Sequence, residues 1–297
     1  MITRMKRLTS RLCRSLLPAA IALGCWQAPA LADPALWVLR DNDSTIYLFG
    51  TVHAMKPGVN WQTTDIDAAF AASNELWVEE TGDEDQALMT QLVSRYGLDP
   101  THPLSAKLTP DQRQKLAKAV QSAHLNLSVI DKTRPWLAAV TLSTVPLVQA
   151  GYDPDQGIDH SLQAQATAAG KPIRSFETPA QQIHIFADLP PQDELDALTQ
   201  TLEEIDQGPA VIAQLIQAWL AGDTEAIDKN VSADMRAQSP SLYKAVFLNR
   251  NQIWTKRIEH LLEGKGTIFI AVGAGHLAGQ DSVIAMLTRD GYQVTRE

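Results

Sequence analysis

Two apolar runs rich in β-branched and aromatic residues lie near opposite ends of the chain, and both end in the pattern Gly-x-x-His. The first run, "YLFGTVH", ends at His53, and the second, "TIFIAVGAGH", ends at His276. Runs of this kind are typical of buried strands, and the glycine lets the backbone turn sharply at the strand end. Functional groups of α/β sheets collect at the carboxyl ends of strands, so we expect both histidines at one edge of one sheet.

Strand and helix signals alternate near both ends of the chain. A β-hairpin is predicted at residues 35–50, where Asp41-Asn42-Asp43-Ser44 separates two apolar runs. A helical period follows, and "NELWVEET" then returns as a strand with Glu79 on the face opposite Leu76 and Val78. This strand follows the first Gly-x-x-His by one helix, so we expect it beside the strand that leads to that motif.

The middle of the chain is rich in helix signals. The segment "TPDQRQKLAKAVQSA" begins with Thr109 as N-cap and Pro110 at the first helical position. Helix and strand signals alternate again from residue 159 to the end. We therefore predict one domain over residues 33–297, with an α/β fold, a central mixed β-sheet, flanking helices and a helical insertion around residues 82–151.

Residues 1–32 have the composition of a cleaved export signal. They contain five Lys or Arg and no acid, and an apolar run from Leu16 to Trp26 precedes a final Ala-Leu-Ala. The run is too short to span a bilayer. We expect cleavage after Ala32 and a periplasmic or secreted protein with no stable membrane span. A lipoprotein signal that ends at Cys25 is the weaker alternative.

Cleavage after Ala32 changes both the chemistry and the charge of the chain. Cys13 and Cys25 lie in the removed segment, which excludes disulfides, thiolate catalysis and Cys-based zinc sites from the mature protein. The segment carries five of the 25 Lys and Arg and none of the 34 Asp and Glu, which leaves a net charge of about −14. A chain with this charge is not expected to bind nucleic acid.

Gly-x-x-His is a weak signal by itself, since a third match, "GIDH", ends at His160. That match stands at a predicted helix start, so we interpret His160 as structural and Asp159 as the helix N-cap. His53 and His276 instead end predicted strands. With Glu79 they supply two imidazoles and a carboxylate, a set that suits Zn²⁺ or, with more oxygen ligands, Mn²⁺ or Fe²⁺. Such an ion activates bound water and polarises a carbonyl group.

Several short segments in combination resemble the TraB/GumN family (TraB/PrgY/GumN), which is related to the Tiki metalloproteases. They are "GTVH", "VEET", "GID", "SFET", "NRNQIW" and "GAGHLAG", and they span nearly the whole mature chain. The resemblance implies a fold of the Tiki/TraB/ChaN type. It also implies a divalent metal ion, Mn, Co or Zn, with His53, Glu79 and His276 as ligands, and metal-dependent hydrolysis of peptides.

We expect Glu79, Glu80 and Arg250 to be catalytic residues. Besides Glu79, which is also a predicted metal ligand, Glu80 is a candidate for the base or its support, and Arg250 would bind a substrate carboxylate or a developing oxyanion. Blander alternatives are a solvated edge position for Glu79 and a helix ion pair for Arg250. At Glu80 and Thr81 the chain departs from many relatives, which have a small residue and an Asp there.

We therefore expect an exported metal-dependent hydrolase, and first of all a peptidase that acts on exported peptides or proteins. One alternative is a non-catalytic periplasmic module that binds a peptide signal or a metallo-cofactor such as haem. Another is an ester hydrolase on the same scaffold. The sequence contains neither a nucleotide-binding glycine loop nor a "GxSxG" elbow, which leaves little support for an ATPase or a serine hydrolase. The oligomeric state is not predicted.

Overall fold

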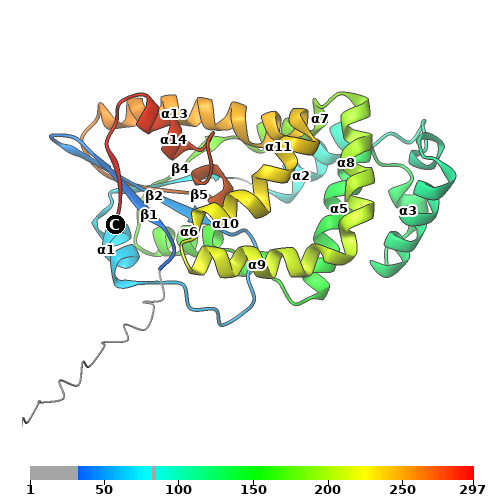
Figure 1. Ribbon diagram of the computed structural model, residues 1–297, viewed down its shortest axis with the longest axis horizontal. Helices are drawn as coiled ribbons and strands as arrows, with labels where there is room; N and C mark the ends of the chain where they lie inside the picture. Colours follow the sequence, from blue (N-terminus) through cyan, green and yellow to red (C-terminus); the bar gives the residue numbers. More distant parts are fainter. Residues whose placement is uncertain (1–32, 82–84) are drawn as a thin grey trace, which may run out of the picture. The chain divides into compact units, whose positions relative to one another are not determined.

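The computed structural model describes residues 33–81 and 85–297, and the predicted export signal lies outside these ranges. The described chain contains a six-stranded sheet with the order β4-β3-β5-β2-β1-β6 (Figure 1). The strands are β1 Leu36–Arg40, β2 Ser44–Thr51, β3 Glu75–Glu80, β4 Ile173–Glu177, β5 Gly266–Gly273 and β6 Val294–Arg296. Strands β2, β5, β3 and β4 run parallel, whereas β1 pairs antiparallel with β2 and β6. The sheet is therefore mixed, as predicted.

Helices fill the segments between the strands. Those before β4 are α1 Thr64–Ala72, α2 Gln86–Gly97, α3 Pro110–Ser122, α4 Leu127–Ile130, α5 Pro135–Gln149 and α6 Ile158–Ala168. Those after β4 are α7 Pro179–Ala187, α8 Pro191–Glu204, α9 Gly208–Leu220, α10 Thr224–Asp228, α11 Asp234–Gln238, α12 Pro240–Tyr243, α13 Asn249–Leu262 and α14 Val283–Arg289. Helices α2 to α5 occupy the predicted insertion. The long helical segment from α7 to α12 was not predicted.

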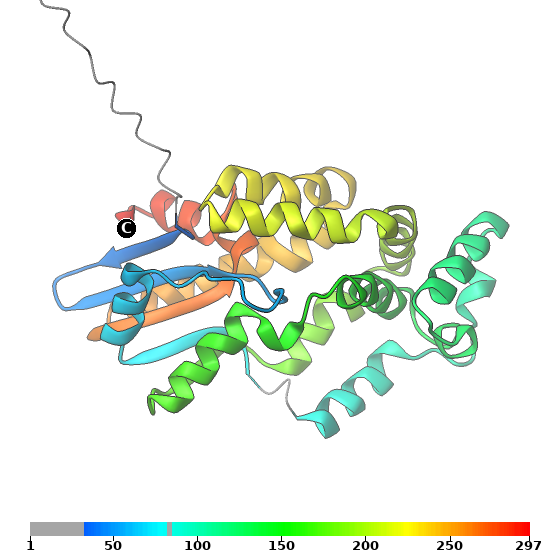
Figure 2. The same ribbon diagram turned by 90° about the horizontal axis from the view of Figure 1, so that it is seen from below.

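Apolar side chains pack on both faces of the sheet. On one face Phe49, Leu76 and Val78 contribute to a core with α1, α6 and α9. On the other face Trp77 and Ile270 pack against α13 and α14. The alternation along β3 thus divides its side chains between two cores, as the period of the strand requires. Figure 1 shows the strands between these two layers, with α13 and α14 above them and α1, α6 and α9 below, and Figure 2 shows the same arrangement from below.

A third apolar cluster joins helices α3, α5 and α8 through Leu116, Leu142 and Leu198. These helices lie at the far end from β1 and β6 (Figure 1). Helix α3 begins with the predicted cap, in which Thr109 and Gln112 form a reciprocal capping box. None of the described helices is long and apolar enough to cross a membrane.

The parallel pairing of β2 with β5 brings the two Gly-x-x-His motifs to the same end of the sheet. Thr51, the last residue of β2, is the Cα partner of Gly273, the last residue of β5. Gly50 permits this approach, because a Cβ at this position would lie 2.9 Å from the Cα of Ala274. Strand β3 pairs with the other edge of β5. It is therefore separated from β2 by β5, rather than adjacent to β2 as predicted.

Candidate functional site

Gly273 marks the point where three of the predicted site residues meet. A Cβ on this glycine would lie 2.9 Å from Oε1 of Glu79, 3.2 Å from Nε2 of His53 and 3.7 Å from Cδ2 of His276. The backbone N–H of Gly273 donates to Glu79 Oε1 at 2.6 Å. The absence of a side chain at Gly273 thus leaves room for the three groups to approach one another.

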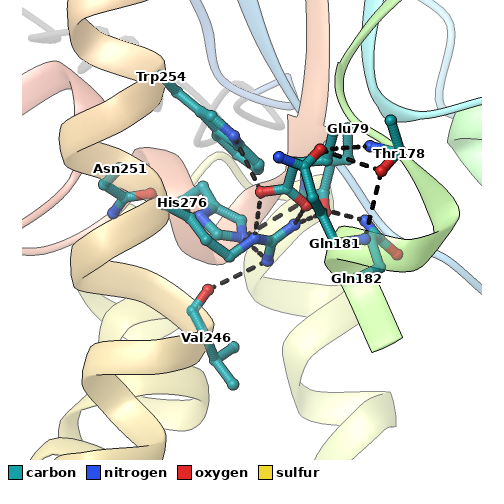
Figure 3. A network of polar contacts seen from close by, with 11 residues as sticks. Glu79, Thr178, Gln181, Gln182, Val246, Asn251, Trp254 and His276 are labelled. Carbon is teal, nitrogen blue, oxygen red and sulfur yellow. Dashed lines mark hydrogen bonds and ion pairs between the residues drawn. The ribbon is translucent and has the colours of Figure 1, made fainter. Parts of the chain in front are cut away.

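Arg250 lies in the first turn of α13, and Figure 3 labels three of its hydrogen-bond partners, Glu79, Val246 and His276. Its NH2 group donates to Glu79 Oε2 at 2.7 Å, and its Nε and NH2 groups donate to the two carboxylate oxygens of Glu177 at 2.7 and 2.9 Å. NH1 donates to His276 Nε2 at 2.9 Å and to the carbonyl oxygen of Val246 at 3.1 Å. These bonds use all five N–H groups of the guanidinium.

The contacts of Arg250 differ from both roles that the sequence suggested. Its carboxylate partners come from β3 and β4, so it does not form an ion pair within its own helix. It is 8% exposed, and every donor is used inside the protein. Binding of a substrate carboxylate or an oxyanion would require one of these bonds to break. Burial opposes the charge, but the hydrogen bonds to Glu177 and the charge of Glu79 raise the pKa of Arg250.

His276 is buried, and both of its ring nitrogens are hydrogen-bonded. The residue is 3% exposed, and its ring centroid lies 4.4 Å from that of Trp254. Nδ1 lies 2.6 Å from Oδ1 of Asn251, which projects from α13 beside it (Figure 3). Because Arg250 can only donate, His276 Nε2 is the acceptor and Nδ1 carries the proton. Burial lowers the pKa of His276 to about 3, so the ring is neutral at neutral pH.

His53 has a different environment. Its side chain is 64% exposed, and Nδ1 lies 3.2 Å from Oδ2 of Asp159. Nε2 therefore faces the shared point at Gly273. Desolvation works to lower the pKa of His53, but the hydrogen bond to Asp159 and the charge of Glu79 outweigh it and raise the pKa to about 9. Water around the exposed ring weakens these interactions without changing their sign.

Asp159 is not the N-cap that the sequence predicted. Helix α6 follows Gly157 and begins without a side-chain capping bond, and Asp159 lies within its first turn. The carboxylate reaches His53 instead. His160, interpreted from the sequence as structural, lines the same cavity as these two residues.

A cavity of about 290 Å³ lies beside His53 and Glu79. Its lining residues come from the ends of the strands, from α6 and from α7: Thr51, His53, Val78, Glu79, Glu80, Pro154, Asp159, His160, Gln163, Gln182 and Ala271. Glu80, the second predicted carboxylate, is therefore a cavity residue, whereas Arg250 and His276 are not among the described residues that line it. A larger cavity of about 740 Å³ between α3, α5 and the α8–α9 connection contains no predicted site residue.

The predicted metal ligands are close together but are not arranged as a metal centre. Among residues 33–81 and 85–297, no group of three or more His, Cys, Asp or Glu side chains is placed to hold a metal ion. His276 has no free ring nitrogen, and Glu79 shares its carboxylate with Arg250 and Gly273. As arranged, the donor set does not fit a three-ligand centre, and the assignment of His53, Glu79 and His276 as ligands stays a prediction.

Residues 35–296 match the profile of the TraB/PrgY/gumN family. The chain belongs to this family. This confirms the family that the short motifs indicated. Among curated proteins, this TraB/PrgY/gumN chain is 24% identical to Metalloprotease TIKI2 of Xenopus tropicalis, over 87% of the chain and 59% of the relative.

Two other relatives are similarly distant from this TraB/PrgY/gumN chain. It is 26% identical to Metalloprotease TIKI1 of Homo sapiens over 63% of the chain and 42% of the relative. It is 19% identical to an uncharacterized protein of Treponema pallidum over 85% of the chain and 80% of the relative. No solved structure matches significantly. The chain thus spans less than two thirds of the length of these Tiki proteins, and the similarity leaves open what it does.

Two carboxylates of the site in this TraB/PrgY/gumN chain were missed by the sequence reasoning. Glu177 is 9% exposed and accepts from both Arg250 and Nε1 of Trp254. A signal existed for it, because "SFET" ends a parallel strand just as "VEET" does. Asp159 offered no comparable signal, since an acid at a helix start is more often a cap.

Proposed function

We propose that this TraB/PrgY/gumN protein is an exported hydrolase that cleaves peptide bonds of exported peptides or proteins. One observation carries the proposal: the carboxylate of Glu79 and Nε2 of His53 face the same point beside a cavity. The Tiki relatives, which are named metalloproteases, support a peptide as the substrate. Export rests on the composition of residues 1–32, and mass spectrometry of the exported protein should place Asp33 at its start.

Glu79 and His53 are a complementary pair for adding water to a carbonyl group. Burial acts to raise the pKa of Glu79, but the nearby imidazoles and the guanidinium lower it to about 2, so this carboxylate stays ionised. It can orient a water molecule and accept the proton that the water loses as it attacks the carbonyl carbon. The raised pKa of His53 favours a ring that holds a proton and can donate it from Nε2 to the leaving group. Asp159 fixes the orientation of that ring.

The proposal is tested by incubating the purified mature protein with a library of unfolded peptides and identifying products by mass spectrometry. Hydrolysis should be abolished by His53→Ala and by Glu79→Gln. His102→Ala is the matched control, because His102 is also exposed and bonded to a carboxylate, that of Asp99. A dependence on Mn²⁺, Co²⁺ or Zn²⁺ is proposed from the metalloprotease relatives, and each ion is added after treatment with a chelator.

The same assay separates the alternatives. Saturable binding of a peptide or of haem without any product would favour a binding or regulatory module. Cleavage of ester substrates with peptides left intact would favour an ester hydrolase. If the control His102→Ala lost activity as fully as His53→Ala, the cavity beside His53 would not be the reaction site.

A further inference from the structure

We propose that Arg250 and a divalent metal ion compete for Glu79 and His276, and that the guanidinium is the resident cation of this site. The site can hold one of these two positive charges at a time, whether or not the protein turns over a substrate.

His276 has no lone pair available for a metal ion. Its Nε2 accepts an N–H of Arg250 at 2.9 Å, and its Nδ1 donates to Asn251. A metal ion bound by histidine sits about 2.0–2.1 Å from the ring nitrogen, on that nitrogen's single lone pair. The lone pair of Nε2 cannot serve Arg250 and a metal ion at the same time.

Glu79 is likewise occupied by Arg250. Its Oε2 accepts from Arg250 at 2.7 Å, and its Oε1 lies 3.9 Å from His276 Nε2. An ion that bridged Glu79 and His276 would therefore stand next to the guanidinium. Like charges repel strongly where water is excluded, and Arg250 is 8% exposed. Entry of the ion requires the guanidinium to withdraw from both partners.

Arg250 is anchored on its other side by Glu177. The Nε and NH2 groups form a two-pronged contact with Glu177, and the guanidinium carbon lies 4.6 Å from the ring centroid of Trp254. NH1 also reaches Val246, which belongs to the π-helical turn Lys244–Leu248 directly before α13. One edge of Arg250 is thus held by the fold, while the other edge occupies Glu79 and His276.

Titration of Co²⁺ into the metal-free mature protein tests the proposal, with calorimetry and the visible absorption of Co²⁺ as readouts. Arg250→Ala should bind Co²⁺ at least about tenfold more tightly than the wild type, because it frees both ligands. Millimolar guanidinium chloride should reverse this gain by refilling the vacated space. Arg174→Ala is the control, since Arg174 is an exposed arginine paired with Glu75, and it should bind Co²⁺ as the wild type does.

Equal Co²⁺ affinity in the wild type and in Arg250→Ala would overturn the proposal. Tight binding by the wild type that His276→Ala abolishes would also overturn it, because His276 would then ligate the ion with Arg250 in place. Should Arg250→Ala not fold, nitrogen NMR of the wild type with Zn²⁺ decides. The His276 signals should stay unchanged at Zn²⁺ concentrations that shift those of His53, and simultaneous shifts would contradict the competition.

Discussion

His53 and His276 end two paired strands with the same Gly-x-x-His pattern, yet their surroundings are opposite. The side chain of His53 is 64% exposed, its Nδ1 is bonded to Asp159, and its Nε2 faces Gly273 and Glu79 beside a cavity. His276 is 3% exposed and is bonded at both nitrogens by Arg250 and Asn251. The strand ends are alike, and the helices packed over them differ.

The position of each histidine ring and its chemical environment therefore have different structural causes. The motif and the pairing of β2 with β5 determine where each imidazole lies. Helix α6 then supplies a single carboxylate to one ring, whereas α13 supplies a guanidinium and an amide to the other. Equal motifs therefore do not imply equal roles. In this molecule the exposed histidine is the candidate for proton transfer, and the buried one helps to hold the network.

The largest effect is expected where the network loses the guanidinium of Arg250. Arg250→Met should lower the free energy of unfolding by about 3–5 kcal/mol, because Glu177, which is buried, and Glu79, whose side chain is 13% exposed, would lose the guanidinium that pairs with both. Urea unfolding of the metal-free protein measures this change. Arg174→Met, which removes an exposed partner of Glu75, should cost less than about 1 kcal/mol. Similar losses in both variants would mean that the buried carboxylates do not depend on Arg250.

A direct comparison of the two histidines should show the next largest effect. His276→Ala should lower the free energy of unfolding by about 2–3 kcal/mol, because it opens a gap beside Trp254 and leaves an Arg250 N–H and Asn251 without their partner. His53→Ala should lower it by less than about 1 kcal/mol, because the ring is largely exposed and water screens its pairing with Asp159. The same urea unfolding measurement serves for both. If the two variants are equally destabilised, the contrast between the histidines does not hold.

The fold class could be predicted from the sequence, but most of the contrast between the two histidines could not. The hairpin, β3 and the cap of α3 follow from local patterns, and the family follows from short motifs in combination. The bond between His53 and Asp159 spans 106 residues, and that between Arg250 and Glu177 spans 73. Such contacts depend on which helix packs over which strand end, and local patterns do not contain that information.

The sheet order shows the same limit. The chain order of β2 and β3 suggested that they are neighbours, but β5 inserts between them from the far end of the sequence. The π-helical turn that precedes Arg250 also has no local signal in the sequence. The types of side chain in the site could therefore be predicted from the sequence, whereas the residue that each of them contacts could not.

A smaller effect should separate the exposed histidine from its partner. Asp159→Asn should reduce peptide hydrolysis by on the order of tenfold, because the ring of His53 loses its orienting carboxylate. The rate of product formation by mass spectrometry measures this, and the free energy of unfolding should stay nearly constant. Asp99→Asn, which alters the equivalent exposed pair with His102, is the control. A rate unaffected by Asp159→Asn would remove His53 from the proposed proton transfer.

The pH dependence of stability should differ in sign between the two histidines. The pKa of His276 is lowered from 6.5 to about 3, so below pH 6.5 the unfolded chain takes up a proton that the folded chain refuses, and stability falls toward pH 3. Glu79, lowered from 4.5 to about 2, extends this loss as the pH falls through that range. The pKa of His53 is raised to about 9, so its contribution to the free energy of unfolding is complete below pH 6.5 and disappears as the pH rises through 9. Water around the ring makes this contribution smaller.

Urea unfolding from pH 4 to pH 9 should therefore show that His276→Ala flattens the acid side of the stability profile, whereas His53→Ala changes only the alkaline side. If both variants changed the acid side of the profile equally, the pKa values of the two rings would not be shifted in opposite directions.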